Sequence, residues 1–197
     1  MTLLHGLGHI ASGRLRSQPG MVLIKPSAVA FTGTSATIGA NGQVTFSALT
    51  SLSLDDCFTA DFDNYVVALT GTISSTGFIR WRMYDGSAAV TTGTYTIQHI
   101  NVNGTSVTSG RDGTQSWLDF TNWTSGGSLW SGSMISVYGP FLAQPTAIRF
   151  VNLDNSSSAR IYETAGTHSL STSYPGLNLF PSAGSISGTV SVYGVRS

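Results

Sequence analysis

Short segments in which apolar and polar residues alternate follow one another through most of this chain, and this pattern restricts the fold more than any other feature. The clearest is residues 78–84, where Ile79, Trp81 and Met83 alternate with aromatic and charged residues. Because successive side chains of a β-strand point to opposite faces, these three residues share one face, which we assign to the core. The same period recurs in residues 94–102, 147–153 and 186–194.

Turn residues separate these segments about every eight to twelve positions, a spacing typical of antiparallel sandwiches. Asn41 and Gly42, for example, favour a two-residue hairpin turn, since both residue types tolerate a positive φ. We therefore expect an all-β protein of about eight to eleven short strands, arranged as an antiparallel β-sandwich or jelly roll. Residues 104–132 are rich in Gly, Ser and Thr, and we interpret them as a long surface loop or an irregular hairpin.

The composition is poor in charge. Charged residues make up 9% of the chain, against about 25% in ordinary soluble domains, while 41% hydrophobic residues argue against disorder. The formal net charge is zero, so the chain lacks the basic excess that binds nucleic acid, and no nucleic-acid partner is expected. Because net charge keeps dissolved proteins apart, this surface favours contact with protein neighbours. A Ser/Thr-rich surface that is simply soluble is the alternative.

Residues 1–27 differ from the rest of the chain because they contain basic residues and no acid, the first acid being Asp55. We predict that they form an extended anchoring arm that docks on a neighbouring chain, followed by a β-sandwich domain in residues 28–197. A frayed terminus is the alternative. The residues expected to anchor the arm are Leu3, Leu4, Leu7, Ile10, Arg14 and Arg16.

Membrane insertion is not expected, because no apolar run approaches the about 20 residues of a membrane-spanning helix. In the first residues the positive charges follow the apolar stretch, whereas in a secretion signal they precede it.

Metal-ligand spacings are weak in this sequence, and we predict no metal and no cofactor. His5 and His9 stand four apart, but the glycines between them argue against a helix that would bring them together. The acids around Cys57 lack the order of an EF-hand, so a polar loop is favoured and a loose calcium site is the alternative. Cys57 itself is expected to be a small buried apolar residue. The acids concerned are Asp55, Asp56, Asp61 and Asp63.

Catalytic motifs are also missing from the sequence: it contains no nucleophile elbow, no phosphate-binding Gly-rich loop and no zinc-protease motif. We therefore predict that the protein is not an enzyme. The least favoured alternative is a polysaccharide-cleaving enzyme, which needs two carboxylates across a cleft. Asp112, Asp119 and Glu163 are the acids that could supply them.

Three tryptophans gather with polar residues in one part of the chain, and they leave two interpretations open. A tryptophan has a large apolar face and a polar N–H, so it suits a wet contact with a partner or a glycan. The same side chains could instead plug the end of the sandwich. The residues of this candidate contact are Trp117, Asp119, Asn122, Trp123 and Trp130.

Two C-terminal segments are distinctive: residues 169–181 (SLSTSYPGLNLFP) and residues 184–194 (GSISGTVSVYG). Together they resemble the end of many small tail and head-surface proteins of tailed bacteriophages. Residues 38–47, 61–65 and 136–141 resemble upstream parts of these proteins, so the likeness covers roughly residues 22–197.

This resemblance implies a virion structural protein with a galectin-like or jelly-roll sandwich, exposed on the outer surface of the tail or head. It implies a tail-fibre, minor-tail or capsid-decoration role, with other virion proteins as partners, and no catalytic residues. A homo-oligomer is expected, a trimer among the candidate symmetries. The alternative function is a receptor- or glycan-binding module at the tail tip, which would attach to host surface polysaccharide.

Overall fold

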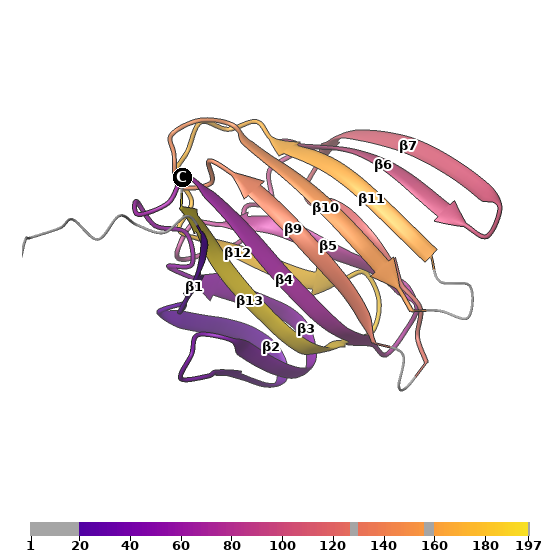
Figure 1. Cartoon of the computed structure of the whole chain (residues 1–197), viewed down its shortest axis with the longest axis horizontal. Helices are drawn as coiled ribbons and strands as arrows, with labels where there is room; N and C mark the ends of the chain where they lie inside the picture. The colour runs from indigo at the N-terminus through magenta and orange to yellow at the C-terminus, as the bar shows by residue number, and fades with distance from the viewer. Residues whose placement is uncertain (1–19, 127–129, 156–159, 197) are drawn as a thin grey trace, which may run out of the picture.

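The computed structural model describes residues 20–126, 130–155 and 160–196, and within these ranges the chain forms thirteen strands and no helix (Figure 1). Every strand pair is antiparallel. The strands are β1 (Gly20–Ile24), β2 (Ala28–Ile38), β3 (Val44–Asp55), β4 (Asn64–Ile73), β5 (Gly77–Tyr84), β6 (Tyr95–Asn103), β7 (Ser106–Gln115), β8 (Leu118–Trp123), β9 (Ser131–Tyr138), β10 (Thr146–Asp154), β11 (Arg160–His168), β12 (Gly176–Pro181) and β13 (Ile186–Arg196).

One continuous sheet folds over on itself to form two layers. Its order is β7-β6-β11-β10-β9-β4-β13-β3-β12-β5-β8, with β1 added on β13 and β2 on β3. The corner lies at β3, because its first half pairs with β13 and its second half pairs with β12. The other end of the sheet comes back to itself, since β8 packs against β6, β10 and β11. The result is an all-β, nearly closed sandwich, which confirms the all-β antiparallel architecture predicted from the sequence.

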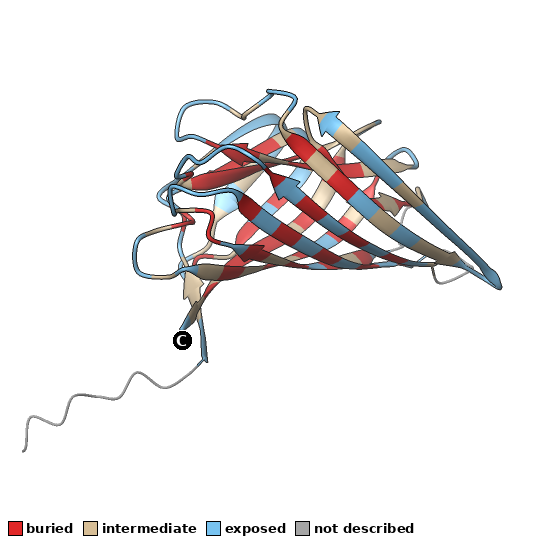
Figure 2. Cartoon of the chain, turned by 90° about the horizontal axis from the view of Figure 1, so that it is seen from above, coloured by how far each residue is buried: buried red, intermediate tan, exposed pale blue. Residues whose placement is uncertain are grey.

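The core lies between the layers and is built by strict alternation along the strands, seen as alternating buried and exposed bands in Figure 2. Ile79, Trp81 and Met83 are fully buried, which confirms the face predicted for residues 78–84. The ring of Trp81 meets the ring of Phe150 from the facing layer edge-on at 6.1 Å, and Phe120 stacks on Phe150 at 4.7 Å. Burying each such side chain contributes about 1.5–3 kcal/mol.

The turn at Asn41 and Gly42 joins β2 to β3, as predicted, but it is longer than a two-residue hairpin. Residues 39–43 lie between the strands, and the N–H of Gly39 donates to the carbonyl of Gln43 (2.7 Å). Gly42 has a φ of 96°, and its N–H donates back to the carbonyl of Gly39. A side chain at position 42 would be strained there.

Two sequence predictions need correction. Residues 104–132, expected to be a loop or irregular hairpin, contain the strands β7 and β8. β7 escapes a search for alternation because it is an exposed edge strand of small and polar residues, held by backbone pairing with β6 alone. Because β7 and β8 were not expected, the described residues form thirteen strands, more than the eight to eleven predicted.

Part of the predicted arm, residues 1–27, belongs to the sheet. Gly20–Ile24 forms β1 and pairs with the end of β13, Gly20 facing Arg196. Residues 1–19, which hold most of the proposed anchor, lie outside the described residues, so the arm stays a prediction. Across the described ranges, the chain has no helix of the length and apolarity required to traverse a membrane.

Candidate functional site

Tyr162 lies at the centre of a mixed aromatic and polar group at the end of the sandwich where β8 meets β11. Its side chain is 5% exposed and stacks on the ring of His99 of β6 (5.1 Å between centroids, 20° between planes). Phe78 of β5 meets Tyr162 edge-on at 6.4 Å. Because β5 belongs to one layer and β6 and β11 to the other, this group bridges the two layers.

Three polar side chains surround Tyr162. Asn101 faces Tyr162 in the β6–β11 ladder, Asn122 faces Phe78 in the β5–β8 ladder, and Arg160 begins β11 on the same side as Tyr162. The Oδ1 atoms of both asparagines and the Nε of Arg160 are buried, with no hydrogen-bond partner among the described residues. Folded proteins rarely leave buried polar atoms unpaired, so a water or a ligand group is needed to satisfy these atoms.

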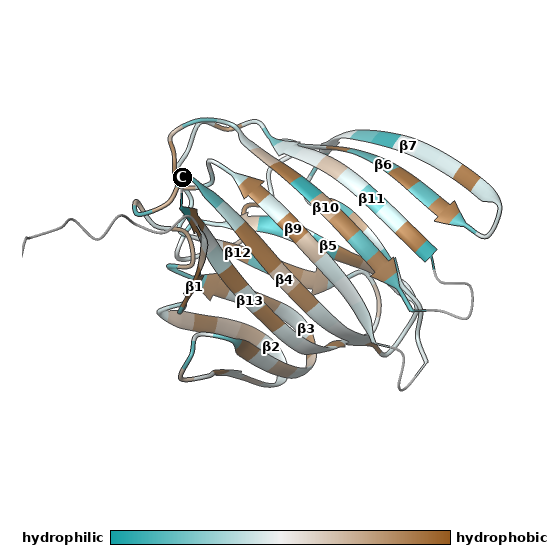
Figure 3. Cartoon of the chain, in the orientation of Figure 1, coloured by the Kyte–Doolittle hydropathy of each residue, from teal (hydrophilic) through white to brown (hydrophobic). Residues whose placement is uncertain are grey.

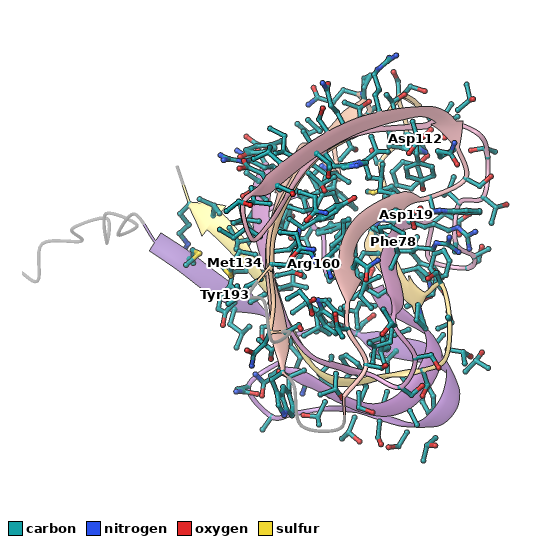
Figure 4. All side chains as sticks on the ribbon, turned by 90° about the vertical axis from the view of Figure 1, so that its right-hand side faces the viewer. Phe78, Asp112, Asp119, Met134, Arg160 and Tyr193 are labelled. Atoms are coloured by element: carbon teal, nitrogen blue, oxygen red, sulfur yellow. The ribbon has the colours of Figure 1, made fainter. Side chains whose placement is uncertain are left out.

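Two carboxylates complete this group, which we call the edge cluster: Phe78, His99, Asn101, Asp112, Asp119, Asn122, Arg160 and Tyr162. The pKa of Tyr162 is raised to about 12, mainly by burial and in smaller part by the negative charges of Asp119 and Asp112. The phenol is therefore protonated at neutral pH and can donate a hydrogen bond. Figure 4 shows Asp112, Asp119 and Phe78 on one side of the molecule, with Met134 and Tyr193 on the other.

An arginine–aromatic stack on the outer face of β5, β8 and β12 holds Asp119 in place. The Nε of Arg80 donates to Asp119 Oδ1 (2.7 Å), and its guanidinium lies 4.4 Å from the ring centroid of Trp117. Arg82 lies 4.3 Å from the ring of Phe180, and its Nε donates to the carbonyl of Ser116 (2.9 Å). Burial lowers the pKa of Arg82, and the neighbouring Arg80 lowers it too, although the guanidinium stays charged at neutral pH.

Three of the five residues of the predicted contact thus meet at one edge: Trp117, Asp119 and Asn122. Trp123 does not join them, because it is fully buried in the core, as the packing interpretation required. A β-bulge explains this: Thr121 pairs with Ile79 and Asp119 pairs with Arg80, so Phe120 is an extra residue and the alternation inverts after it. Trp130 is 54% exposed just before β9 and makes no aromatic contact with the edge cluster in the described part of the chain.

A second unusual surface, the apolar face, covers the outer side of the larger layer. Six apolar residues on this face are exposed between 47% and 68%. Strand pairing sets Met134 opposite Val151 and Leu153 opposite Ile161, whereas Ile100 lies opposite Glu163 and Val107 opposite Val102. Figure 3 shows brown hydrophobic bands along β6, β7, β9, β10 and β11, the strands that carry these residues. The six apolar residues are Ile100, Val107, Met134, Val151, Leu153 and Ile161.

The apolar face contains a shallow hollow of about 420 Å³, lined by Met134, Val151, Leu153 and Ile161 and deepened where Gly132 carries no side chain. Beside it, Arg149 and Glu163 form an ion pair across β10 and β11. Glu163 therefore points away from the edge cluster, which leaves Asp112 and Asp119 as the two carboxylates of the enzyme alternative that lie on that side.

The remaining candidates give no site. In the described ranges, no three His, Cys, Asp or Glu residues are grouped so that they could hold a metal ion. Cys57 is fully buried, as predicted, and burial raises the pKa of its thiol well above the usual range. His168 is buried between the rings of Tyr95 and Tyr174, and burial lowers its pKa to about 4. His5 and His9 lie outside the described residues.

Comparison with known proteins gives little. No protein-family model matches the chain, and no curated protein matches it. Among solved structures, it is similar to domain 4 of AbnA, a GH43 extracellular arabinanase from Geobacillus stearothermophilus, in complex with arabinotriose. The identity is 12%, the match covers 85% of this chain and 82% of that chain, and the TM-score is 0.39. A similarity of this degree supports no inference about function.

Proposed function

We propose that the chain is a non-enzymatic structural component of a tailed-phage virion, displayed on the outer surface of the head or tail and associated with further copies of itself. The observation that carries the proposal is the apolar face. Its six apolar side chains are about half exposed, whereas soluble monomers rarely expose large contiguous apolar patches. The C-terminal resemblance to phage virion proteins supports the particular setting.

A second copy of this chain is the partner that the apolar face suits best. The face carries one basic and one acidic residue, Arg149 and Glu163, beside its apolar centre. Under a two-fold axis each of these charges can meet the opposite charge of the other copy, so the face is complementary to itself. Since the chain has no net charge, two copies approach without long-range repulsion.

The hollow next to Met134 also favours contact with a second copy. It is lined almost wholly by apolar groups, and the absence of a side chain at Gly132 leaves room for one from outside. An apolar side chain of a second copy that filled this hollow would contribute about 1–3 kcal/mol, as when a large residue is buried in a core. Close packing of this kind distinguishes a lasting interface from a passing contact.

Attachment to other virion proteins is assigned to the N-terminal arm, and the galectin-like or jelly-roll character of the sandwich belongs to the same proposal. A strand added to a neighbour's sheet edge is a common way to anchor such an arm. Because Gly20–Ile24 pairs with β13, a deletion of residues 1–19 leaves the described sheet intact.

The experiment compares particles that carry the full chain with particles that carry the 1–19 deletion, both labelled at Ser197. We expect the full chain at regular positions on the outer surface, and the deletion folded but absent from particles. Normal incorporation of the deletion would refute the anchoring role, and absence of the full chain from particles would refute the virion setting. Release of reducing sugar from host polysaccharide by the purified protein would contradict the non-enzymatic part.

A further inference from the structure

We propose that the edge cluster binds an uncharged, hydroxyl-rich sugar unit of a surface polysaccharide. The observation behind this is the meeting of unpaired buried polar atoms with aromatic rings at one end of the sandwich. Asn101, Asn122 and Arg160 come from three different strands, yet each has a polar atom beside Tyr162 or Phe78 that is buried without a partner. The inference goes beyond the proposed structural role and does not depend on it.

The unpaired atoms define the hydrogen bonds that a ligand must supply. The Oδ1 atoms of Asn101 and Asn122 accept hydrogen bonds, whereas the Nε of Arg160 donates one. A sugar hydroxyl can both donate and accept, so hydroxyl groups can satisfy the two acceptors as well as the donor. An anionic group such as a phosphate only accepts and would leave the two asparagine oxygens unpaired.

Charge selects further among sugars. Asp112 and Asp119 both act on the Tyr162 hydroxyl, and a carboxylate is a strong acceptor for a hydroxyl proton. Arg80 is already bonded to Asp119, and the guanidinium of Arg160 balances the second carboxylate, so the cluster has no net charge to attract an acidic sugar. The site therefore favours an uncharged sugar.

The aromatic groups supply the apolar part of the contact. Tyr162 and His99 are stacked, and Phe78, which is half-buried, stands with its edge against Tyr162. The C–H face of a sugar ring is apolar, so it can pack on such a surface while its hydroxyls reach the polar atoms around it. Bonds to Arg80 and the stacking of Arg80 on Trp117 fix Asp119 before a ligand arrives, which limits the entropy cost of binding.

A packing role alone does not account for these atoms. An unpaired buried amide costs about 1–3 kcal/mol, and an apolar side chain of similar shape would remove that cost. A structural asparagine in this fold donates its Nδ2. That of Asn152 donates to two carbonyls although its Oδ1 is unpaired, and that of Asn178 donates to Ser51 Oγ (3.0 Å), Ser53 Oγ (3.0 Å) and the carbonyl of Leu52 (3.3 Å). This contrast provides a matched pair of variants.

The test measures binding of the full chain to three uncharged polysaccharides, dextran, mannan and galactan, with alginate as an acidic control, by affinity electrophoresis and calorimetry. We expect binding to at least one uncharged polymer and none to alginate. Asn122→Ala should weaken that binding about tenfold, with an unchanged or higher Tm. Asn178→Ala should lower the Tm and leave binding unchanged in the folded protein.

Three results would overturn the proposal. One is the absence of binding to all three uncharged polymers up to their solubility limits. A second is a lower Tm for Asn122→Ala with binding unchanged, which would give that residue a structural role. The third is a crystal structure, soaked with oligosaccharides of the same polymers, in which ordered waters alone satisfy Asn101, Asn122 and Arg160. None of these results bears on particle incorporation, so the two proposals can fail separately.

Discussion

The two faces of β11 carry opposite kinds of anomaly. On its outer side, Ile161 contributes an apolar side chain to solvent and lies in the apolar face. On its inner side, Arg160 and Tyr162 hold polar groups that are buried, one of them without a partner. An exposed apolar patch is relieved by a protein surface, whereas buried unpaired polar atoms are relieved by a polar ligand. Because successive side chains of a strand point to opposite faces, one strand can contribute to assembly on one side and to ligand binding on the other.

The largest effect is expected from a charge placed in the apolar face. Leu153→Lys puts an ammonium group where the two copies would meet, and two such groups face each other across a two-fold axis. Like charges brought together and desolvated cost several kcal/mol, so the dimer dissociation constant should rise about 100-fold or more. Light scattering coupled to gel filtration measures this effect.

Phe31→Lys is the control for that change, because Phe31 is 43% exposed on β2, outside the apolar face. Its oligomeric state should match that of the unchanged protein. If the unchanged protein is a monomer at high concentration, or if both variants dissociate equally, the apolar face is not the self-contact.

A smaller loss of stability is expected at Asn152, which ties the two layers together under the edge cluster. Its Nδ2 donates to the carbonyls of Phe120 (2.7 Å) and Tyr162 (2.8 Å). Asn152→Ala leaves both buried carbonyls with fewer partners, so the free energy of unfolding should fall by about 2–4 kcal/mol. Denaturant unfolding measures it. A change below about 0.5 kcal/mol would mean that water replaces the amide and that the hydrogen bond from Asn152 does not hold β8 against β10.

Acid should weaken the core that lies between the two surfaces. The pKa of buried His168 is about 4, against about 6.5 in an unfolded chain, so the unfolded state binds the extra proton more readily. Stability is then full above about pH 6.5 and falls as the pH drops towards 4, by about 2–3 kcal/mol.

His168→Leu, of similar volume, should remove most of this pH dependence. Unfolding midpoints at pH 7 and pH 4.5 give the comparison. An equal loss in the variant and the unchanged protein would assign the acid sensitivity to other groups.

The smallest effect is expected from one hydroxyl in the edge cluster. Tyr162→Phe keeps the ring that stacks on His99 and removes only the group beside Asp112 and Asp119. Affinity for the polysaccharide that binds should fall about three- to tenfold. Tyr193→Phe, a tyrosine on the other side of the molecule (Figure 4), should have no effect. Equal affinities for the two variants would remove the Tyr162 hydroxyl from the site.

Alternation in the sequence was enough to predict the all-β fold and the core face of β5, because burial of one side of a strand leaves a period of two. It failed for β7, whose exposed edge needs no apolar residues, and for β1, whose pairing depends on β13 about 170 residues later. Trp117, Asp119 and Asn122 could be singled out because their residue types suit a wet contact. Trp123 could not be separated from them, because the bulge at Phe120 leaves no mark in the sequence.

The rest of the edge cluster could not be predicted, because its residues come from distant parts of the sequence. Phe78, His99 and Tyr162 stand far apart in the sequence and meet only when β5, β6 and β11 are placed by the fold. No local signal marks an asparagine as unpaired, since that property depends on every neighbour in the folded chain.

A cryo-electron map of the intact particle, with the sandwich fitted into its density, tests the central claim most directly. We expect the apolar face to lie against another copy of the chain, with a side chain near Leu153 filling the hollow, and the edge cluster to remain open to solvent. A map in which Met134, Val151 and Leu153 face solvent, while the edge cluster is covered by a neighbouring protein, would contradict the account.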